Sequence, residues 1–203
     1  MTEKLSKRER TRQKMLQAAG RNFRRNGYAG IGVDGIAHAA GVTSGAFYAH
    51  FGSKDGAFTA ALERGLDEVI DAIPVFRSEH GSQWVAAFAA YYLGLEHRND
   101  LESGCAMTTL SPEVARSEIG MHLTYEKKMR AIADLIADGL EKSVDDRGLD
   151  NRHARAWAML ATLIGGLTVS RAVADLDLAN MIAASVQRAA VEAAGDAKPV
   201  GVL

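Results

Sequence analysis

Residues 41–54 read GVTSGAFYAHFGSK. The eight residues between the Gly-Val-Thr turn and the Gly-Ser-Lys break are fewer than the roughly 10 to 14 of an ordinary core helix. Phe47 and Phe51 are four positions apart and would share one face of a helix, which leaves Tyr48 and His50 on other faces. The stretch therefore predicts a short helix that is anchored through its two phenylalanines and presents its remaining side chains to a partner.

Two helical patterns precede this short helix. Residues 12–25 carry apolar side chains at helical spacing with basic residues between them, and VDGIAHAA (33–40) repeats the apolar spacing until Gly41 stops it. Thr43 or Ser44 can cap the third helix, because a hydroxyl at this position accepts a hydrogen bond from a free backbone N–H. Two short helices joined by such a turn are typical of a helix-turn-helix, whose second helix enters the major groove of DNA.

The rest of the chain also has helical patterns. Ser53 can cap a fourth helix over about residues 54 to 71, and Pro74 is its expected end, since proline disrupts a helix interior. No segment alternates apolar and polar residues as a strand does, so the expected fold class is all-α. Further helices are expected over about residues 82 to 97, 101 to 115, 117 to 142, 152 to 174 and 178 to 194.

Positive charge is concentrated at the amino-terminal end of the 203-residue chain. Residues 1–54 carry ten Lys or Arg against three acidic residues, a net charge of +7, whereas the rest carries 14 against 22, a net charge of −8. A basic segment on an acidic body suggests that the segment meets a polyanion, although the same charges could also form a solvated face. The sequence has no signal-peptide apolar region and no membrane-spanning run, so no membrane partner is expected.

The amino end of the third helix has the chemistry of a DNA contact. Thr43, Ser44, Gly45 and Ala46 are small enough to let the backbone approach a ligand closely. Hydroxyls and free N–H groups at a helix start also bind phosphate, because the unpaired donors and the helix dipole point the same way. These four residues are therefore candidate DNA-binding residues.

Three residues further along can complete this surface. Tyr48 can donate its hydroxyl to a phosphate, and His50 can do the same or reach a base edge. Alternatively, Tyr48 is a half-buried structural residue and His50 packs against the following helix. Lys54 lies in the first turn of that helix, where a cation is unfavourable unless an anion such as phosphate lies opposite.

The stretch GYAGIGVDGIAHAAGVTSGAFYAHFGSKDGAF resembles the DNA-binding domain of the TetR family of bacterial transcription regulators. It carries an I-A-x-x-A-G-V core, a G-x-x-Y-x-H-F segment and an S-K pair, and the likeness covers roughly residues 10 to 60. In departure from the family, Gly32 stands where Ser or Thr is usual, so the second helix lacks a side-chain cap. The resemblance implies that the DNA backbone is touched by Thr43, Tyr48 and Lys54. It implies that bases are approached by Ser44, Gly45 and Ala46.

The resemblance further implies a DNA-binding domain of residues 1–55 and a helical ligand-binding and dimerisation domain of residues 56–203. Aromatic and methionine side chains recur at helical spacing in the second region, where they could form either an ordinary core or a ligand cavity between helices. The candidate ligand-binding residues are Trp84, Phe88, Tyr92, Cys105, Met121 and Tyr125.

Cys105 is the only cysteine, so the chain forms no intramolecular disulfide, which fits a reducing cytoplasm. It lies in ESGCAMTTLSPEVARS, which resembles a Gly-Cys-apolar segment in one branch of the family, where some members sense electrophiles or oxidants. A cysteine near a helix start can have its thiolate stabilised by the helix dipole, and a buried inert cysteine is the alternative. Ala106 stands where that branch often has proline.

The last two expected helices, over residues 152–174 and 178–194, are rich in Ala and Gly. Small side chains let helices approach closely, either within one subunit or across a two-fold axis. Because TetR-family regulators dimerise through their last two long helices, the resemblance implies a homodimer.

These observations together imply a cytoplasmic, ligand-responsive transcription regulator. The expected activity is that of a repressor, released from a palindromic double-stranded operator by a small-molecule effector or by an oxidant or electrophile. The alternative is a helical ligand-binding protein without specific DNA recognition, which Gly32 and the scarcity of basic residues on the third helix favour. An enzyme, a metal or a cofactor is not expected, because the sequence has no metal-spaced cluster, glycine-rich phosphate loop or nucleophile elbow.

Overall fold

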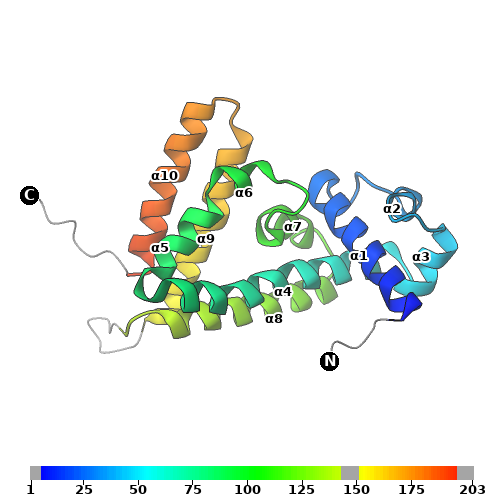
Figure 1. The fold of residues 1–203 in the computed structure, drawn as a ribbon, viewed down its shortest axis with the longest axis horizontal. Helices are drawn as coiled ribbons and strands as arrows, with labels where there is room; N and C mark the ends of the chain where they lie inside the picture. Colours follow the sequence, from blue (N-terminus) through cyan, green and yellow to red (C-terminus); the bar gives the residue numbers. More distant parts are fainter. Residues whose placement is uncertain (1–5, 143–150, 196–203) are drawn as a thin grey trace, which may run out of the picture. The chain divides into compact units, whose positions relative to one another are not determined.

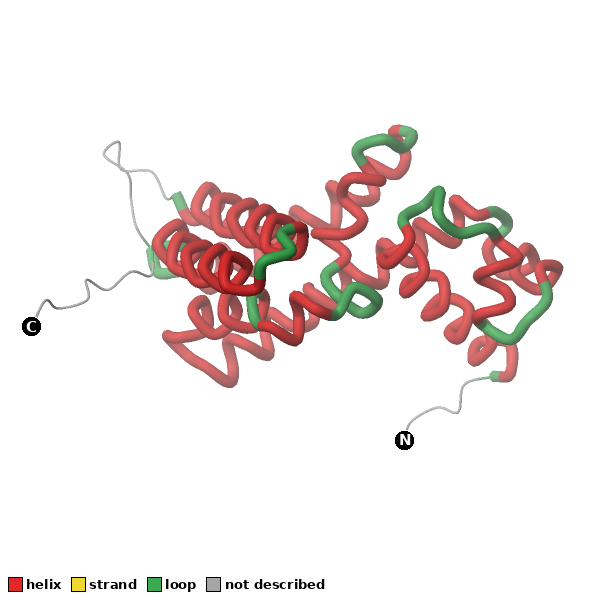
Figure 2. Tube along the Cα trace, turned by 90° about the horizontal axis from the view of Figure 1, so that it is seen from above, coloured by secondary structure: helices red, strands yellow, loops and turns green. Residues whose placement is uncertain are grey.

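The computed structural model describes residues 6–142 and 151–195, and within these ranges every regular element is a helix (Figures 1 and 2). The all-α fold class that the sequence predicts is thus confirmed. None of the described helices combines the length and the hydropathy needed to cross a membrane.

Contacts divide the described chain into two compact units. The first contains the residues up to Leu66 together with Leu101–Tyr125, and the second contains Asp67–Asp100 together with the residues from Glu126 onward. The predicted division into domains 1–55 and 56–203 stays a prediction.

The first unit begins with helix α1, Lys7–Asn26. The Ser6 hydroxyl accepts from the Glu9 backbone N–H at 3.2 Å, and the Glu9 carboxylate accepts from the Ser6 N–H at 2.8 Å. This capping box fixes the start of α1 by satisfying two donors that the helix leaves unpaired. The unit is held together by apolar side chains that are almost completely buried, among them Met15, Phe23, Ile36, Phe47, Phe58 and Leu62.

Helices α2 (Val33–Ala39) and α3 (Ser44–Phe51) follow, and their bounds confirm the predicted pair of short helices. Gly41 takes φ = +67° between them, a value that a side chain disfavours, and the Val42 N–H donates to the Ala37 carbonyl at 3.0 Å. The turn is therefore tight, and it brings the end of α2 against the start of α3.

Helix α4 runs from Lys54 to His80 and belongs in part to each unit. Ser53 caps it as predicted, because its hydroxyl accepts from the Gly56 N–H at 2.9 Å. The prediction that Pro74 ends this helix was wrong, since α4 continues for six residues beyond it. Because Pro74 has no N–H, the carbonyl four residues before it lacks its helical hydrogen bond, and this carbonyl can turn towards solvent since Pro74 is exposed. The neighbouring Ile73 is fully buried and holds the helix to its core.

The other helices up to α9 are shorter than the sequence patterns predict, whereas α10 begins two residues earlier than the predicted helix. The pattern over 82–97 is divided into a 3₁₀ turn (Gly81–Gln83), α5 (Trp84–Tyr92) and α6 (Leu95–Asn99), with a break at Gly94. In the first unit, α7 occupies Ala106–Val114, with Cys105 as its amino-terminal cap position. The last three helices are α8 (Ile119–Gly139), α9 (Arg152–Ala172) and α10 (Leu176–Ala193).

Helices α9 and α10 form an antiparallel pair in the second unit, lying side by side along their lengths (Figures 1 and 2). They approach closely at Gly166, where an added Cβ would lie 2.2 Å from Cγ1 of Val186. The core of this unit is built from buried side chains of α4, α5, α8 and α9, among them Ile73, Phe88, Ile132, Ile136, Leu160 and Leu163.

Candidate nucleic-acid interface

Helix α3 is anchored through its phenylalanines, as the spacing predicts. Phe47 is fully buried, and the centroid of its ring lies 5.3 Å from that of Phe51, which is half-buried. The guanidinium carbon of Arg12 lies 5.6 Å from the centroid of the Phe51 ring, a distance at which a cation is attracted to the face of an aromatic ring. Arg12 of α1 thus brings a positive charge to the carboxyl end of α3.

The amino end of α3 is open. The hydroxyl of Thr43 accepts from the Ala46 N–H at 3.2 Å, which confirms Thr43 rather than Ser44 as the cap. Gly45 is exposed, and a Cβ built on it would meet only the Thr43 hydroxyl oxygen, at 3.8 Å. A ligand can therefore approach the backbone of this first turn closely.

Ser44 has a partner that the sequence patterns did not reveal. Its hydroxyl lies 2.5 Å from Oδ1 of Asp34, which is the second residue of α2. Asp34 is exposed and Ser44 is half-buried, so the pair joins the starts of α2 and α3 at the molecular surface. The one available signal was that Asp34 is an isolated acidic residue within a strongly basic segment.

The two aromatic candidates further along α3 differ in exposure. Tyr48 has 51% of its surface exposed, and its ring packs edge-on against Phe47 with centroids 5.8 Å apart. His50 is half-buried. The hydroxyl of Tyr48 is thus well placed to bond to a partner of α3, whereas His50 offers a smaller surface.

Lys54 is held in place by an aromatic ring. Its Nζ lies 4.3 Å from the centroid of the Tyr28 ring, and the Tyr28 hydroxyl donates to Oδ1 of Asp55 at 2.6 Å. The hydrogen bond to Asp55, followed by burial, raises the pKa of Tyr28 to about 12. Tyr28 was missed from the sequence, because it lies 26 residues before Lys54 and no local spacing connects them.

Gly32 departs from the family pattern as the sequence suggests. It occupies the cap position of α2 and provides no side-chain hydrogen bond there. A glycine cap costs only a few tenths of a kcal/mol relative to Ser or Thr, so α2 still forms.

The aromatic candidates for ligand binding are core residues of the second unit. Trp84, Phe88 and Tyr92 are only 4%, 3% and 2% exposed. The indole N–H of Trp84 donates to the Gly139 carbonyl at 3.2 Å, and Trp84 also lines a pocket of about 320 Å³ with Arg77, Arg155 and others. Arg77 donates to the Asp138 carbonyl in the last turn of α8, and Arg155 donates to the Ala194 carbonyl at the end of α10, so both satisfy acceptors that a helix end leaves unpaired.

The other three candidates lie in the first unit. Cys105 is 7% exposed, and Met121 is half-buried with its sulfur 3.7 Å from the Thr59 hydroxyl. The Tyr125 hydroxyl lies 2.6 Å from that of Ser111, and burial raises the pKa of Tyr125. These three candidates therefore belong to a different unit from Trp84, Phe88 and Tyr92. The ligand-binding role of all six residues stays a prediction.

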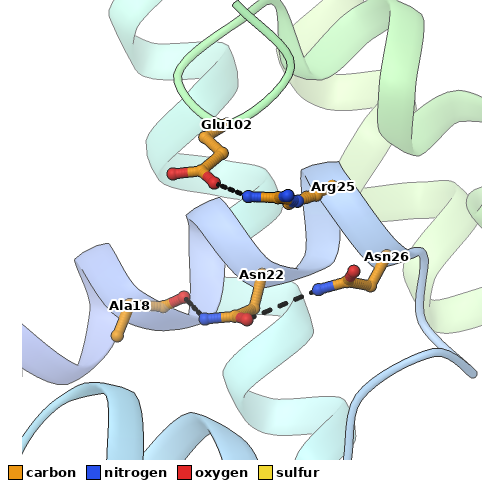
Figure 3. A network of polar contacts seen from close by, with 5 residues as sticks. All are labelled: Ala18, Asn22, Arg25, Asn26 and Glu102. Atoms are coloured by element: carbon orange, nitrogen blue, oxygen red, sulfur yellow. Dashed lines mark hydrogen bonds and ion pairs between the residues drawn. The ribbon is translucent and has the colours of Figure 1, made fainter.

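A second pocket, of about 500 Å³, lies beside the carboxyl half of α1. The sequence patterns missed it. Arg25 forms an ion pair with Glu102, and Asn22 donates to the Ala18 carbonyl at 2.8 Å while accepting from the Asn26 amide at 3.4 Å (Figure 3). This network connects α1 to the segment before α7 within the first unit.

Comparison with known proteins identifies this arrangement of helices. Residues 15–61 match the family described as bacterial regulatory proteins, tetR family. The HTH-type transcriptional activator FasR of Mycolicibacterium smegmatis is 26% identical to this chain over 155 residues, which are 75% of this chain and 67% of FasR.

Two solved structures share the fold over nearly their whole length. A TetR-family transcriptional regulator from Cytophaga hutchinsonii superposes with a TM-score of 0.76 at 16% identity and covers 94% of this chain and 98% of its own. FadR from Bacillus subtilis, solved in complex with stearoyl-CoA, gives a TM-score of 0.64 at 14% identity over 87% and 98% of the two chains. The amino-terminal helices of this chain thus match those of the tetR family of bacterial regulatory proteins, and the solved structures extend the likeness of fold to nearly the whole chain.

Proposed function

We propose that this regulator is an effector-responsive repressor that binds a roughly palindromic operator as a homodimer in the cytoplasm. The observation that carries the proposal is the open amino end of α3, where Thr43 caps the helix and Gly45 is exposed, with the 51% exposed Tyr48 one turn further along. In a helix-turn-helix this end of the second helix contacts base edges in the major groove. Arg12, over the ring of Phe51, and Lys54, which follows α3 in the chain, supply positive charge at the carboxyl end of this helix.

The outer faces of α9 and α10 support the homodimer. Large apolar side chains remain exposed there in the single chain: Trp157 is 41% exposed, Val169 50% and Met181 60%. Small residues such as Ala161 and Gly165 lie between them on the exposed side of α9. A self-complementary apolar face of this kind is typical of a two-fold interface, in which two such helices meet their symmetry mates.

Effector control follows from the spacing of the two recognition helices in the dimer. They must be about 34 to 36 Å apart, or a multiple of this, to enter successive major grooves. An effector that binds better to a dimer with another spacing would release DNA, and operator DNA must then weaken the effector by the same factor. Equal effector affinity with and without operator would therefore rule out this form of control.

Two effector classes are proposed. A small molecule would bind in the helical body, and the FadR structure with stearoyl-CoA makes this acyl thioester the first probe. An oxidant or electrophile would instead act at Cys105, whose 7% exposure limits access to the thiol in the resting state.

Activation is a second candidate function, because the curated relative FasR is named a transcriptional activator. A reporter gene placed behind the operator separates the two: deletion of the regulator raises expression under a repressor and lowers it under an activator. The alternative of a ligand-binding protein without DNA recognition predicts no change in either direction.

Fluorescence anisotropy of the purified protein tests the proposal. The duplex upstream of its own gene is titrated against a random duplex at two salt concentrations. We expect specific binding to exceed random binding by about 10³ or more. Binding that is equally weak on both duplexes, and equally weak on sequences selected from a random pool, would support the alternative.

The homodimer is tested by sedimentation of Ala161→Glu, which places a charge on the exposed side of α9. We expect this variant to be a monomer that has lost most of its operator affinity. Ala115→Glu is the control, because Ala115 is exposed after the end of α7 and far in the chain from the proposed interface. An Ala161→Glu protein that remains dimeric would place the interface elsewhere.

A further inference from the structure

The hydrogen bond between Ser44 and Asp34 has a direction that the chemistry fixes. The two oxygens lie 2.5 Å apart. An ionised carboxylate has no hydrogen to donate, whereas a serine hydroxyl has one, so Ser44 must be the donor. The single hydrogen of Ser44 is thus directed towards Asp34, and its oxygen retains only lone pairs for any other partner.

The neighbouring hydroxyl has the opposite polarity. Thr43 accepts the capping bond from the Ala46 N–H at 3.2 Å, so its own hydrogen remains available for donation. A donor at Thr43 suits a phosphate oxygen, which is an acceptor. Two adjacent hydroxyls at the start of α3 therefore differ in what they can bind.

We propose that Asp34 fixes Ser44 as a hydrogen-bond acceptor, and that the pair selects the base carrying an exocyclic amino group at the step that the amino end of α3 reaches. This inference rests on the proposed operator binding through α3. In the major groove cytosine presents N4–H₂ and adenine N6–H₂ as donors, whereas guanine O6 and thymine O4 are acceptors. Cytosine is preferred to adenine, because adenine N7 is a further acceptor beside its amino group.

The charge of Asp34 sharpens the choice. Its side chain is exposed on the same surface as the start of α3, so a guanine or thymine at this step would place an acceptor opposite a carboxylate and a hydroxyl that can only accept. Like-charged or acceptor-only contacts of this kind reject a wrong partner more than they strengthen the right one. Asp34 thus determines base specificity through its hydrogen bond with Ser44.

The test compares base preferences of wild type, Asp34→Asn and Ser44→Ala. The half-site is first obtained by selection from random duplexes, and each of its positions is then replaced in both half-sites and measured by competition anisotropy. For wild type we expect one position at which guanine or thymine, in place of cytosine or adenine on the same strand, weakens binding by about tenfold.

The variants should flatten this preference for different reasons. In Asp34→Asn the amide can donate to Ser44, which frees the serine hydrogen. Replacing the base at the selected position should then weaken binding by less than about threefold. Affinity for all duplexes should rise, because a negative charge near the DNA is removed. Ser44→Ala removes the acceptor and should flatten the same position. Thr43→Ala is the control, because loss of the cap and of a phosphate donor should weaken every duplex and leave the base profile unchanged.

The outcomes separate this inference from the proposed function. Every base pair has an amino base on one strand, so the variants decide: an unchanged profile in both Asp34→Asn and Ser44→Ala overturns the inference and leaves the regulator intact. A wild type without any sequence preference overturns both. Thermal unfolding of each variant shows whether it is folded, and Ser44→Ala alone still decides the outcome if Asp34→Asn is not.

Discussion

Lys54 lies over the ring of Tyr28, with its Nζ 4.3 Å from the ring centroid. The contact offsets an unfavourable position, because a lysine in the first turn of α4 lies near the positive end of the helix dipole. The Tyr28 ring is in turn fixed by its hydrogen bond to Asp55 in the same turn. The ammonium is therefore oriented in the free protein, so the proposed phosphate contact would cost less side-chain entropy than one made by an unrestrained lysine.

Replacing Lys54 should reduce the salt dependence of operator binding. We expect Lys54→Gln to lower the slope of log affinity against log salt by about one unit, because one phosphate contact is lost. Lys127→Gln makes the same change of charge at an exposed residue of α8 and should leave the slope unchanged. Equal slopes for wild type and Lys54→Gln would show that this ammonium does not contact the phosphate backbone.

Gly45 should matter for DNA binding and not for folding. A Cβ at this position would make only an ordinary contact with the Thr43 hydroxyl in the free protein, so Gly45→Ala should fold normally and gain up to about 1 kcal/mol of helix stability. The same methyl would lie between α3 and DNA, and we expect about a tenfold loss of operator affinity. Gly120→Ala, at another helical glycine with open space around it, provides the control for both measurements.

Gly166 should matter for folding. A methyl at Gly166 would lie 2.2 Å from Cγ1 of Val186, so we expect Gly166→Ala to lower the free energy of unfolding by roughly 1 to 3 kcal/mol. Adding Val186→Ala should recover part of this loss, which a double-mutant cycle in urea measures. The adjacent Gly165→Ala has no atom within 4 Å of its new methyl and should not destabilise the protomer. Additive effects of the two substitutions would mean that α9 and α10 shift apart to accommodate the methyl.

Local patterns predicted the helices but not the contacts between distant segments. The i, i+4 spacing of Phe47 and Phe51 and the hydroxyl of Ser53 gave the anchoring of α3 and the cap of α4, because both are decided within a few residues. The rule against proline inside a helix failed at Pro74, where burial of Ile73 outweighs a single missing hydrogen bond.

Long-range pairs left no signal in the sequence. Arg25 and Glu102 are 77 residues apart, and Tyr28 and Asp55 are 27 apart, so neither pair has a characteristic spacing. The pair of Ser44 and Asp34 spans only ten residues, but it depends on the tight turn at Gly41. A sequence pattern predicts which residues share a helix face, whereas these contacts depend on how the helices dock.

His97 is expected to make the stability of the second unit depend on pH. Its ring contacts those of Tyr91 and Tyr92, with centroids 5.1 and 5.2 Å away, and its Nε2 is buried without a hydrogen-bond partner among the described residues. Burial and then the nearby charge of Arg171 lower the pKa of His97 to about 4, although Asp100 opposes them. The folded state thus favours the neutral ring.

Because the pKa of His97 is depressed on folding, its contribution to stability is complete above the unfolded value of about 6.5 and is lost as the pH falls towards 4. We expect the free energy of unfolding of wild type to fall more steeply over this range than that of His97→Phe, which keeps an aromatic ring beside the tyrosines. The difference in slope should stay below the one-proton limit of about 1.4 kcal/mol per pH unit, because the ring is partly exposed to solvent. Urea titrations of both proteins between pH 7.5 and pH 4.5 measure it, and parallel curves would show that His97 is protonated as easily in the folded chain as in the unfolded one.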